Sequence, residues 1–312
     1  MPRFVTFTPN PALDVSTAVD RLVEAHKMRC EAASLHPGGG GINVARVLHR
    51  LGAEVLAVYP CGGPTGGRLH GLLQDEGVPG LRLPVGQETR ESFTVLERGS
   101  GREYRFVLPG PTLEAAEWRG CLDRLASSCT PPAWLVSSGS LPPGVNVDGH
   151  AQVARMARAL GVRMVVDTSG PALAAALQAG VWLVKPSLRE LSELAGQPLP
   201  TLQAQREAAR RLITEGQARM VALSLGGQGA LLVTASECLQ ADALPVPIAS
   251  SVGAGDSFLA ALVCSLDRGE EAAQALAHAV AAGAAAVMSA GTALCERSDV
   301  ERLCRQVQVR DC

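Results

Sequence analysis

Residues 251–257 of this chain are Ser-Val-Gly-Ala-Gly-Asp-Ser, and an amphipathic helical pattern follows them directly. The glycines let backbone N–H groups point into one concave space, and the helix that begins there adds the positive end of its dipole. Gly253, Ala254 and Gly255 would then form an anion hole suited to a transferring phosphoryl group. Asp256 stands where it can accept a proton from a substrate hydroxyl. The alternative is a glycine-rich turn in which Asp256 only caps the helix.

A second glycine-rich segment, Pro-Gly-Gly-Gly-Gly-Ile-Asn-Val-Ala-Arg, occupies residues 37–46. Four consecutive glycines let the backbone approach a ligand closely. A helical pattern, 44–51, follows at once, and Asn43 at its start can bond sugar hydroxyls. A flexible loop is the alternative, and the regular helix after the glycines makes it the weaker one.

Short apolar strands alternate with helices along most of the chain. The predicted strands are 4–8, 55–59, 134–137, 163–167, 182–184 and 220–224. The predicted helices are 44–51, 68–76, 149–160, 171–178, 201–215, 256–266, 271–288 and 299–307. Such alternation calls for a parallel sheet with right-handed crossovers. We therefore expect one Rossmann-like α/β domain over residues 1–312, with helices flanking the sheet.

Two stretches break this rhythm. Residues 92–97 and 103–107 alternate in polarity and are joined by Gly99-Ser100-Gly101, which is a hairpin signal. Residues 14–35 also lack a helical period. We expect these pieces to pair into a small antiparallel sheet, a lid formed by inserted segments at about 14–35 and 88–108.

Bulk properties exclude several classes of protein. The net charge of the 312 residues is −2 and the arginines are scattered, so neither nucleic acid nor another polyelectrolyte is an expected partner. No apolar run is long enough to span a membrane, and the N-terminus lacks a signal-peptide layout. The nine cysteines show no CxxC spacing, which favours free thiols in a reducing cytoplasm. The six histidines have no ligand spacing, so a metal hydrolase lacks support.

Two further segments follow predicted strands, at the edge of the sheet where open α/β folds bind ligands. Residues 224–229, Ser-Leu-Gly-Gly-Gln-Gly, match neither a Walker A loop nor the GxGxxG fingerprint, and a plain turn is equally plausible. Residues 185–190, Lys-Pro-Ser-Leu-Arg-Glu, offer a cation for nucleotide phosphates and a carboxylate for Mg²⁺-bound water. A surface ion pair is the alternative for them.

Taken together, these segments resemble the ribokinase/phosphofructokinase-B family over essentially the whole chain. The early family signature is similar to residues 38–45 and the late one to residues 252–256. Further resemblance to the phosphosugar branch lies in residues 8–14, 138–144, 166–170 and 221–226. Within that branch the 1-phosphofructokinases and tagatose-6-phosphate kinases usually have lysine where this chain has Gly40. The minor bacterial 6-phosphofructokinases have glycine there, and they also match residues 27–30, 104–110 and 291–295.

The resemblance implies a ribokinase fold that dimerises through β-sheet lids, with Mg²⁺-ATP as donor and Asp256 as base. By resemblance the sugar-phosphate positions are Asp14, Lys27, Arg29, Gly39, Asn43, Arg90, Arg105 and Ser140. The ATP positions are Lys185, Ser187, Ser224, Gly226, Gly227, Gly229 and Ser251. Glu190 would act on Mg²⁺ through water. A K⁺ site, where present, would be formed by Ser250, Val252, Ser289, Gly291 and Ala293.

The implied reaction is ATP-dependent phosphorylation of fructose 6-phosphate at its 1-hydroxyl, a step of glycolysis. A 1-phosphofructokinase or a tagatose-6-phosphate kinase is the first alternative, because related sugars share the fold and most contacts. A non-catalytic sugar-phosphate sensor is a remote one, since Asp256 and its glycines are intact. The sequence departs from the family's Asn-x-x-Glu at Ser187, and serine is too short to reach as far toward ATP or Mg²⁺.

Overall fold

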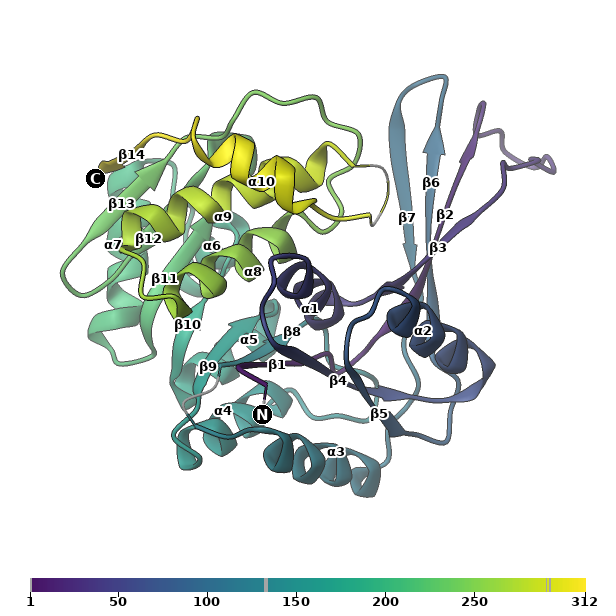
Figure 1. Cartoon of the computed structure of the whole chain (residues 1–312), viewed down its shortest axis with the longest axis horizontal. Helices are drawn as coiled ribbons and strands as arrows, with labels where there is room; N and C mark the ends of the chain where they lie inside the picture. The colour runs from purple at the N-terminus through teal and green to yellow at the C-terminus, as the bar shows by residue number, and fades with distance from the viewer. Residues whose placement is uncertain (1, 132–133, 290, 292) are drawn as a thin grey trace.

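The computed structural model describes residues 2–131, 134–289, 291 and 293–312, and its main body is a ten-stranded sheet (Figure 1). From one edge to the other the strands are β14 (Val309–Asp311), β13 (Cys238–Ala241), β12 (Ala230–Val233), β11 (Ala218–Ser224), β10 (Val181–Val184), β9 (Arg163–Asp167), β8 (Trp134–Ser138), β1 (Phe4–Phe7), β4 (Val55–Cys61) and β5 (Gly80–Pro84). The strands from β5 to β11 are parallel, which confirms the predicted α/β class.

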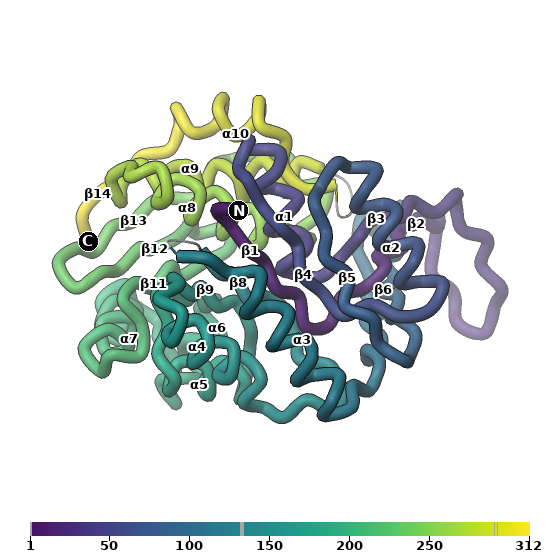
Figure 2. The backbone as a smooth tube through the Cα atoms, turned by 60° about the horizontal axis from the view of Figure 1, so that its bottom comes forward, coloured from purple at the N-terminus to yellow at the C-terminus, as the bar shows by residue number. Residues whose placement is uncertain are grey.

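Helices cover both faces of this sheet (Figure 2). One face carries α1 (Gly40–Arg50), α2 (Gly63–Asp75), α8 (Ala254–Asp267), α9 (Ala272–Val287) and α10 (Arg297–Cys304). The other carries α3 (Ala115–Ser128), α4 (Gly149–Ala159), α5 (Gly170–Ala179), α6 (Leu188–Ala195) and α7 (Leu202–Thr214). Because each helix buries its apolar side against aliphatic strands, two hydrophobic cores form, one on each face. No helix among the described residues is long and apolar enough to cross a membrane.

A second sheet projects from the main body, as Figure 1 shows. Its strands lie in the order β3 (Ser34–Gly38), β2 (Ala12–Val19), β6 (Arg90–Glu97) and β7 (Arg102–Val107). The predicted hairpin is confirmed as the antiparallel pair β6–β7. The prediction of a wholly antiparallel sheet is wrong, because β2 and β6 pair in parallel along their entire length. Residues far apart in sequence supply these two strands, so nothing local in the sequence sets their direction.

Several elements of the structure were not predicted. The strands β12, β13 and β14 form an antiparallel edge, and each has only three or four residues. No α-helix of the described structure separates β11, β12 and β13, so the alternation of strands with helices that marks the parallel strands gives no signal for this edge. The helices α3 and α6 and the strand β5 were also not predicted. Both helices begin with capping boxes, which are a local signal for the start of a helix.

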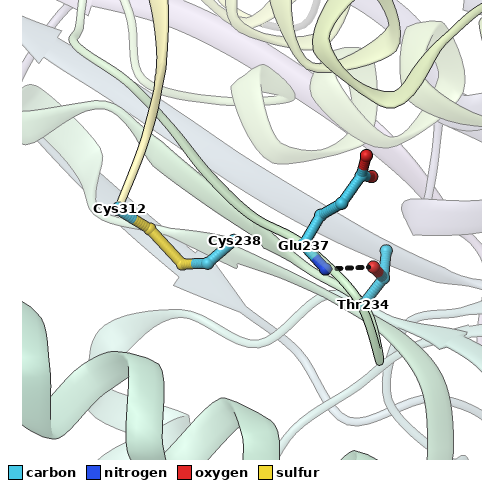
Figure 3. Close-up of a disulfide and its surroundings, with 4 residues drawn as sticks. All are labelled: Thr234, Glu237, Cys238 and Cys312. Carbon is cyan, nitrogen blue, oxygen red and sulfur yellow. Dashed lines mark hydrogen bonds between the residues drawn. A yellow bond between two sulfur atoms is a disulfide. The ribbon is translucent and has the colours of Figure 1, made fainter.

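A disulfide joins Cys238 to Cys312 across the β13–β14 edge (Figure 3). The prediction that all nine cysteines are free is therefore wrong for this pair, while the other seven are free. The two positions are 74 residues apart, so their spacing gave no signal. The antiparallel pairing of Leu239 with Asp311 brings them together, with the two Cα atoms 5.3 Å apart.

Candidate active site

A cavity of about 330 Å³ lies where the small sheet meets the carboxyl ends of the parallel strands. Its walls come from strands of both sheets, from the start of α1 and from the turn before α8. The predicted site residues that line it are Asp14, Gly39, Asn43, Arg90, Arg105, Ser140, Glu190, Ser251, Val252, Gly253 and Asp256. The structure thus brings together residues from both ends of the chain.

Asp256 lies in the first turn of α8, at the wall of this cavity. Gly253 precedes the helix with a φ of 75°, a left-handed conformation that favours glycine, and a Cβ there would overlap the side chain of Leu294. Burial and the neighbouring Asp167 carboxyl raise the pKa of Asp256 to about 6, although a hydrogen bond from Asn43 and the charge of Lys185 oppose the rise. A carboxyl with a pKa near 6 suits a general base at neutral pH.

Asp14 faces the same cavity together with two arginines of the small sheet. Burial raises the pKa of Asp14 to about 6, against the opposing charges of Arg105, Arg46 and Arg90. The guanidinium of Arg90 is held in place by backbone carbonyls, since it donates to Asn10 at 2.8 Å and to Leu108 at 3.0 Å. Two cations that can pair with a phosphate, and a carboxyl that can accept from hydroxyls, are chemically suited to a phosphorylated polyol.

Lys185 is almost fully buried beneath this site. Its Nζ lies 3.1 Å from an Asp167 carboxyl oxygen, and the charge is close to Asp256 as well. Burial opposes the charged amine, but Asp167, Asp256 and Glu190 together outweigh that cost, so the pKa of Lys185 lies above its usual value. The side chain therefore places a fixed positive charge under the turn before α8, near Gly255.

Apart from Ser251, which lines the cavity, the predicted nucleotide residues lie beside it, at the ends of adjacent strands. Lys185 follows β10, and Ser187 forms a bridge with Ser224 at the end of β11. Ser187 has a definite structural role: its Oγ accepts from the backbone N–H of Glu190, and its own N–H donates to Glu190 Oε2 at 2.8 Å. Gly226 and Gly227 belong to an exposed turn closed by Gly229. None of these residues except Glu190 and Ser251 lines the cavity.

Two predicted sugar-phosphate residues stand apart from the cavity. Lys27 and Arg29 are exposed in the segment 20–33, which connects β2 to β3. They do not line the cavity within one chain. Of the predicted K⁺ positions, Ser250 is buried and Val252 lines the cavity, but the carbonyl of Ala293 already accepts a hydrogen bond from Arg50 at 2.6 Å. Thr292, in the matched segment 291–295, lies outside the described residues.

Several residues at the site were not singled out from the sequence. Ser138, Asp167 and Thr168 line the cavity from the ends of β8 and β9, and their position after predicted strands was the available signal. His150 is fully buried and bonds both Ser137 Oγ and the Gly139 carbonyl, at 2.9 and 3.0 Å. Because a carbonyl only accepts, Nε2 carries the proton and holds the turn at Gly139, which lines the cavity.

The chain is similar to known proteins in both sequence and structure. The model of the family described as "pfkB family carbohydrate kinase" matches residues 11–299. ATP-dependent 6-phosphofructokinase isozyme 2 of Mycobacterium tuberculosis is 47% identical over 301 residues, which cover 96% of this chain and 88% of that protein.

Two solved structures of phosphofructokinase-2 from Escherichia coli superpose over nearly the whole chain. The complex with fructose-6-phosphate has a TM-score of 0.93 and 39% identity, and the complex with potassium 0.94 and 40%. Each comparison covers 98% of this chain and 99% of the other. The match of the family model over most of the chain, together with a cavity built from both family signatures, shows that the chain belongs to the pfkB family of carbohydrate kinases.

Proposed function

We propose that the chain transfers the γ-phosphoryl group of ATP to the 1-hydroxyl of fructose 6-phosphate. One observation carries this proposal: Asp256, with a pKa near 6, shares a cavity with Asp14 and the guanidinium groups of Arg90 and Arg105. The relative from M. tuberculosis is named for the same reaction, and the E. coli structure holds fructose-6-phosphate.

The residues have separable roles in this proposal. Arg90 and Arg105 bind the 6-phosphate, a dianion that needs charge-assisted partners. Asp14, Asn43, Gly39 and Ser140 orient the sugar. Asp256 then takes the proton of the attacking hydroxyl, while backbone N–H groups at the start of α8 stabilise charge on the transferring phosphoryl group. The sugar is aligned before the reaction, which supplies much of the rate in such transfers.

The oxygen-rich residues on the nucleotide side fit Mg²⁺ with ATP. Glu190 lines the cavity and most of its side chain is buried, and carboxylate oxygens are ligands that Mg²⁺ prefers. Glu190 would hold the ion through water, and the ion would neutralise phosphate charge. Lys185, Ser224, Ser251 and the turn of Gly226, Gly227 and Gly229 would surround the nucleotide. Ser187 caps α6 and would act by holding Glu190 in place, without contacting ATP or Mg²⁺ itself.

The choice of sugar phosphate is the first thing to test. At Gly40, the position that distinguishes the alternative kinases, any Cβ would overlap Ser138 Oγ, so a lysine could not be accommodated without a shift. A coupled assay with fructose 6-phosphate, fructose 1-phosphate and tagatose 6-phosphate in parallel should show the highest kcat/KM for the first. A preference for either of the others would support the alternatives, and no turnover at all would favour a sensor.

We predict that the protein is a dimer whose interface includes the small sheet. Phe93 pairs with Phe106 and Val95 with Tyr104, so these side chains share one face, and more than half of Phe106 is exposed. Aromatic and aliphatic side chains gathered on an open face of a sheet are typical of a protein–protein interface. Lys27 and Arg29, which do not reach the cavity of their own chain, would lie near the partner.

Sedimentation at micromolar concentration should therefore give a dimer, and Phe106→Asp should shift it toward monomer. Val147→Asp, which changes an equally exposed side chain outside the small sheet, is the matched control and should leave the dimer intact. A stable, fully active wild-type monomer would refute the proposal.

We also predict activation by K⁺, bound by backbone carbonyls beside the turn before α8. Ser250, Val252, Ser289, Gly291 and Ala293 would supply them, and the carbonyl of Ala293 would share its oxygen with the hydrogen bond from Arg50. A K⁺ ion there would add positive charge beside the anion hole. Initial rates in K⁺ should exceed those in Na⁺ or choline at equal ionic strength, and equal rates in all three would count against the site.

The cytoplasm remains our proposed location, because the proposed substrates are intermediates of glycolysis. The Cys238–Cys312 disulfide is the observation that argues against it, since disulfides are rare in reducing compartments.

A further inference from the structure

Arg46 in α1 is a charged side chain with only 1% of its surface exposed. Two of its nitrogens meet the carboxylate of Glu76, the residue that ends α2: Nε lies 2.7 Å from Oε2 and the terminal nitrogen NH2 2.6 Å from Oε1. Burying a guanidinium is costly, and a bidentate carboxylate is the geometry that best offsets this cost. The buried Arg46–Glu76 pair therefore carries a desolvation cost that an apolar side chain at the same position would avoid.

The other terminal nitrogen of Arg46 connects this pair to the active site. It donates to the Pro37 carbonyl at 3.2 Å and to Asn43 Oδ1 at 3.4 Å. Asn43 Nδ2 in turn donates to Asp256 Oδ2 at 2.8 Å. A guanidinium has only donors and a carboxylate only acceptors, so the amide of Asn43 fits between them in one orientation. Turned over, it would face a donor with its NH₂ group and the carboxylate with its oxygen.

We propose that Arg46, anchored by Glu76, is a positioning residue that sets the amide orientation of Asn43 and through it the charge state of Asp256. The role rests on the proposed function of Asp256 as the base. Arg46 does not line the cavity, and its hydrogen-bonded connection to Asp256 runs through Asn43.

The consequence is a change in how readily Asp256 takes up a proton. The hydrogen bond from Asn43 favours the charged carboxylate and opposes the rise in pKa caused by burial. Without Arg46 the amide loses one of the two interactions that fix its orientation. The bond to Asp256 is then weaker, and the pKa of Asp256 rises further. The other titratable or charged groups facing Asp256 are Asp167, Lys185 and Asp14, and those facing Arg46 are Glu76, His36, Arg50 and Asp14.

Three variants test this role. Arg46→Met removes the guanidinium. Arg46→Lys keeps the charge and most of the stem, but its single ammonium cannot hold Glu76 with a fork and reach Asn43 as well. Arg50→Met is the matched control, because Arg50 lies one turn further along α1 and also approaches Glu76, at 3.7 Å, without a hydrogen bond to Asn43 in the described structure.

The first measurement is the titration of the Asp256 carboxyl by ¹³C NMR, with Asp256→Asn assigning the resonance. Arg46→Met and Arg46→Lys should raise this pKa by about one pH unit, as loss of a charge-assisted hydrogen bond does, and Arg50→Met should not move it. If Arg46→Met does not fold, Arg46→Lys decides the question. An Asp256 pKa in Arg46→Lys equal to that of the wild type would overturn the proposal.

Turnover gives a second measurement that a merely structural role would not reproduce. In both Arg46 variants kcat should fall about fivefold at pH 6 and recover almost fully near pH 8.5, because a shift of one unit matters only near the pKa. A loss that is equal at all pH values would contradict the proposal. The NMR titration needs no catalysis, so a chain inactive on all three sugar phosphates would refute the proposed function while the titration still decides the role of Arg46.

Discussion

Asp256→Asn should lower kcat by on the order of 100-fold or more while leaving the fold and sugar binding nearly intact. Asparagine has the shape of aspartate and can still accept the hydrogen bond from Asn43, which reaches Asp256 Oδ2 at 2.8 Å in the native structure. What it cannot do is take the proton of the attacking hydroxyl. The residual rate would come from alignment of the substrates and from the backbone donors at the start of α8.

The pH dependence of turnover provides the check on this result. A base acts only when deprotonated, so the wild-type rate should fall as the pH drops through about 6, the pKa of Asp256. Asp256→Asn should lose this dependence along with the rate. Binding of fructose 6-phosphate, measured by calorimetry, is the control for an intact site. Near-wild-type turnover in the variant would remove Asp256 from the mechanism.

Arg90→Ala should raise the KM for the sugar phosphate by about 10- to 100-fold, the effect of losing a charge-assisted contact worth about 1.5–3 kcal/mol. The KM for ATP should change far less, because Arg90 comes from the small sheet and most of the proposed nucleotide residues follow β10 and β11. The effect should be large because backbone carbonyls hold this guanidinium in place, so little entropy is lost when substrate binds.

Two further substitutions serve as controls for Arg90→Ala. Arg90→Lys keeps the charge and loses the fork, so it should fall between the wild type and Arg90→Ala. Arg102→Ala removes an exposed cation from the same sheet that does not line the cavity, and its kinetics should match the wild type. Equal increases in both KM values for Arg90→Ala would show that Arg90 does not face the phosphate.

The parallel core of the fold was predictable because its signals are local. Strands such as 163–167 and helices such as 149–160 carry their own apolar period, and their alternation implies a parallel sheet. The direction of β2 against β6 was not predictable, because it depends on a pairing between residues almost 80 positions apart, such as Ala12 with Arg90. The disulfide was not predictable for the same reason, because its two cysteines are 74 positions apart in the sequence.

The candidate site was predicted best where a residue type and a turn coincide. Asp256 after a glycine turn and Asn43 after four glycines could be recognised from the sequence, and both line the cavity. The role of Arg46 could not be recognised from the sequence, because an arginine in a helix is normally exposed to solvent. Only the structure shows that Glu76, 30 residues later, closes on it.

The Cys238–Cys312 bond also changes how the chain would respond to mechanical force. It closes a covalent ring that contains α8, α9 and α10, and Asp256 lies within that ring. When the chain is pulled by its two ends, tension passes from Cys238 directly to Cys312, and the enclosed helices carry none of it. The fully stretched chain would then be shorter by about 250 Å, the length of the bypassed segment at about 3.4 Å per residue. The helix that bears Asp256, the proposed base, would be protected from stretching until the disulfide is reduced.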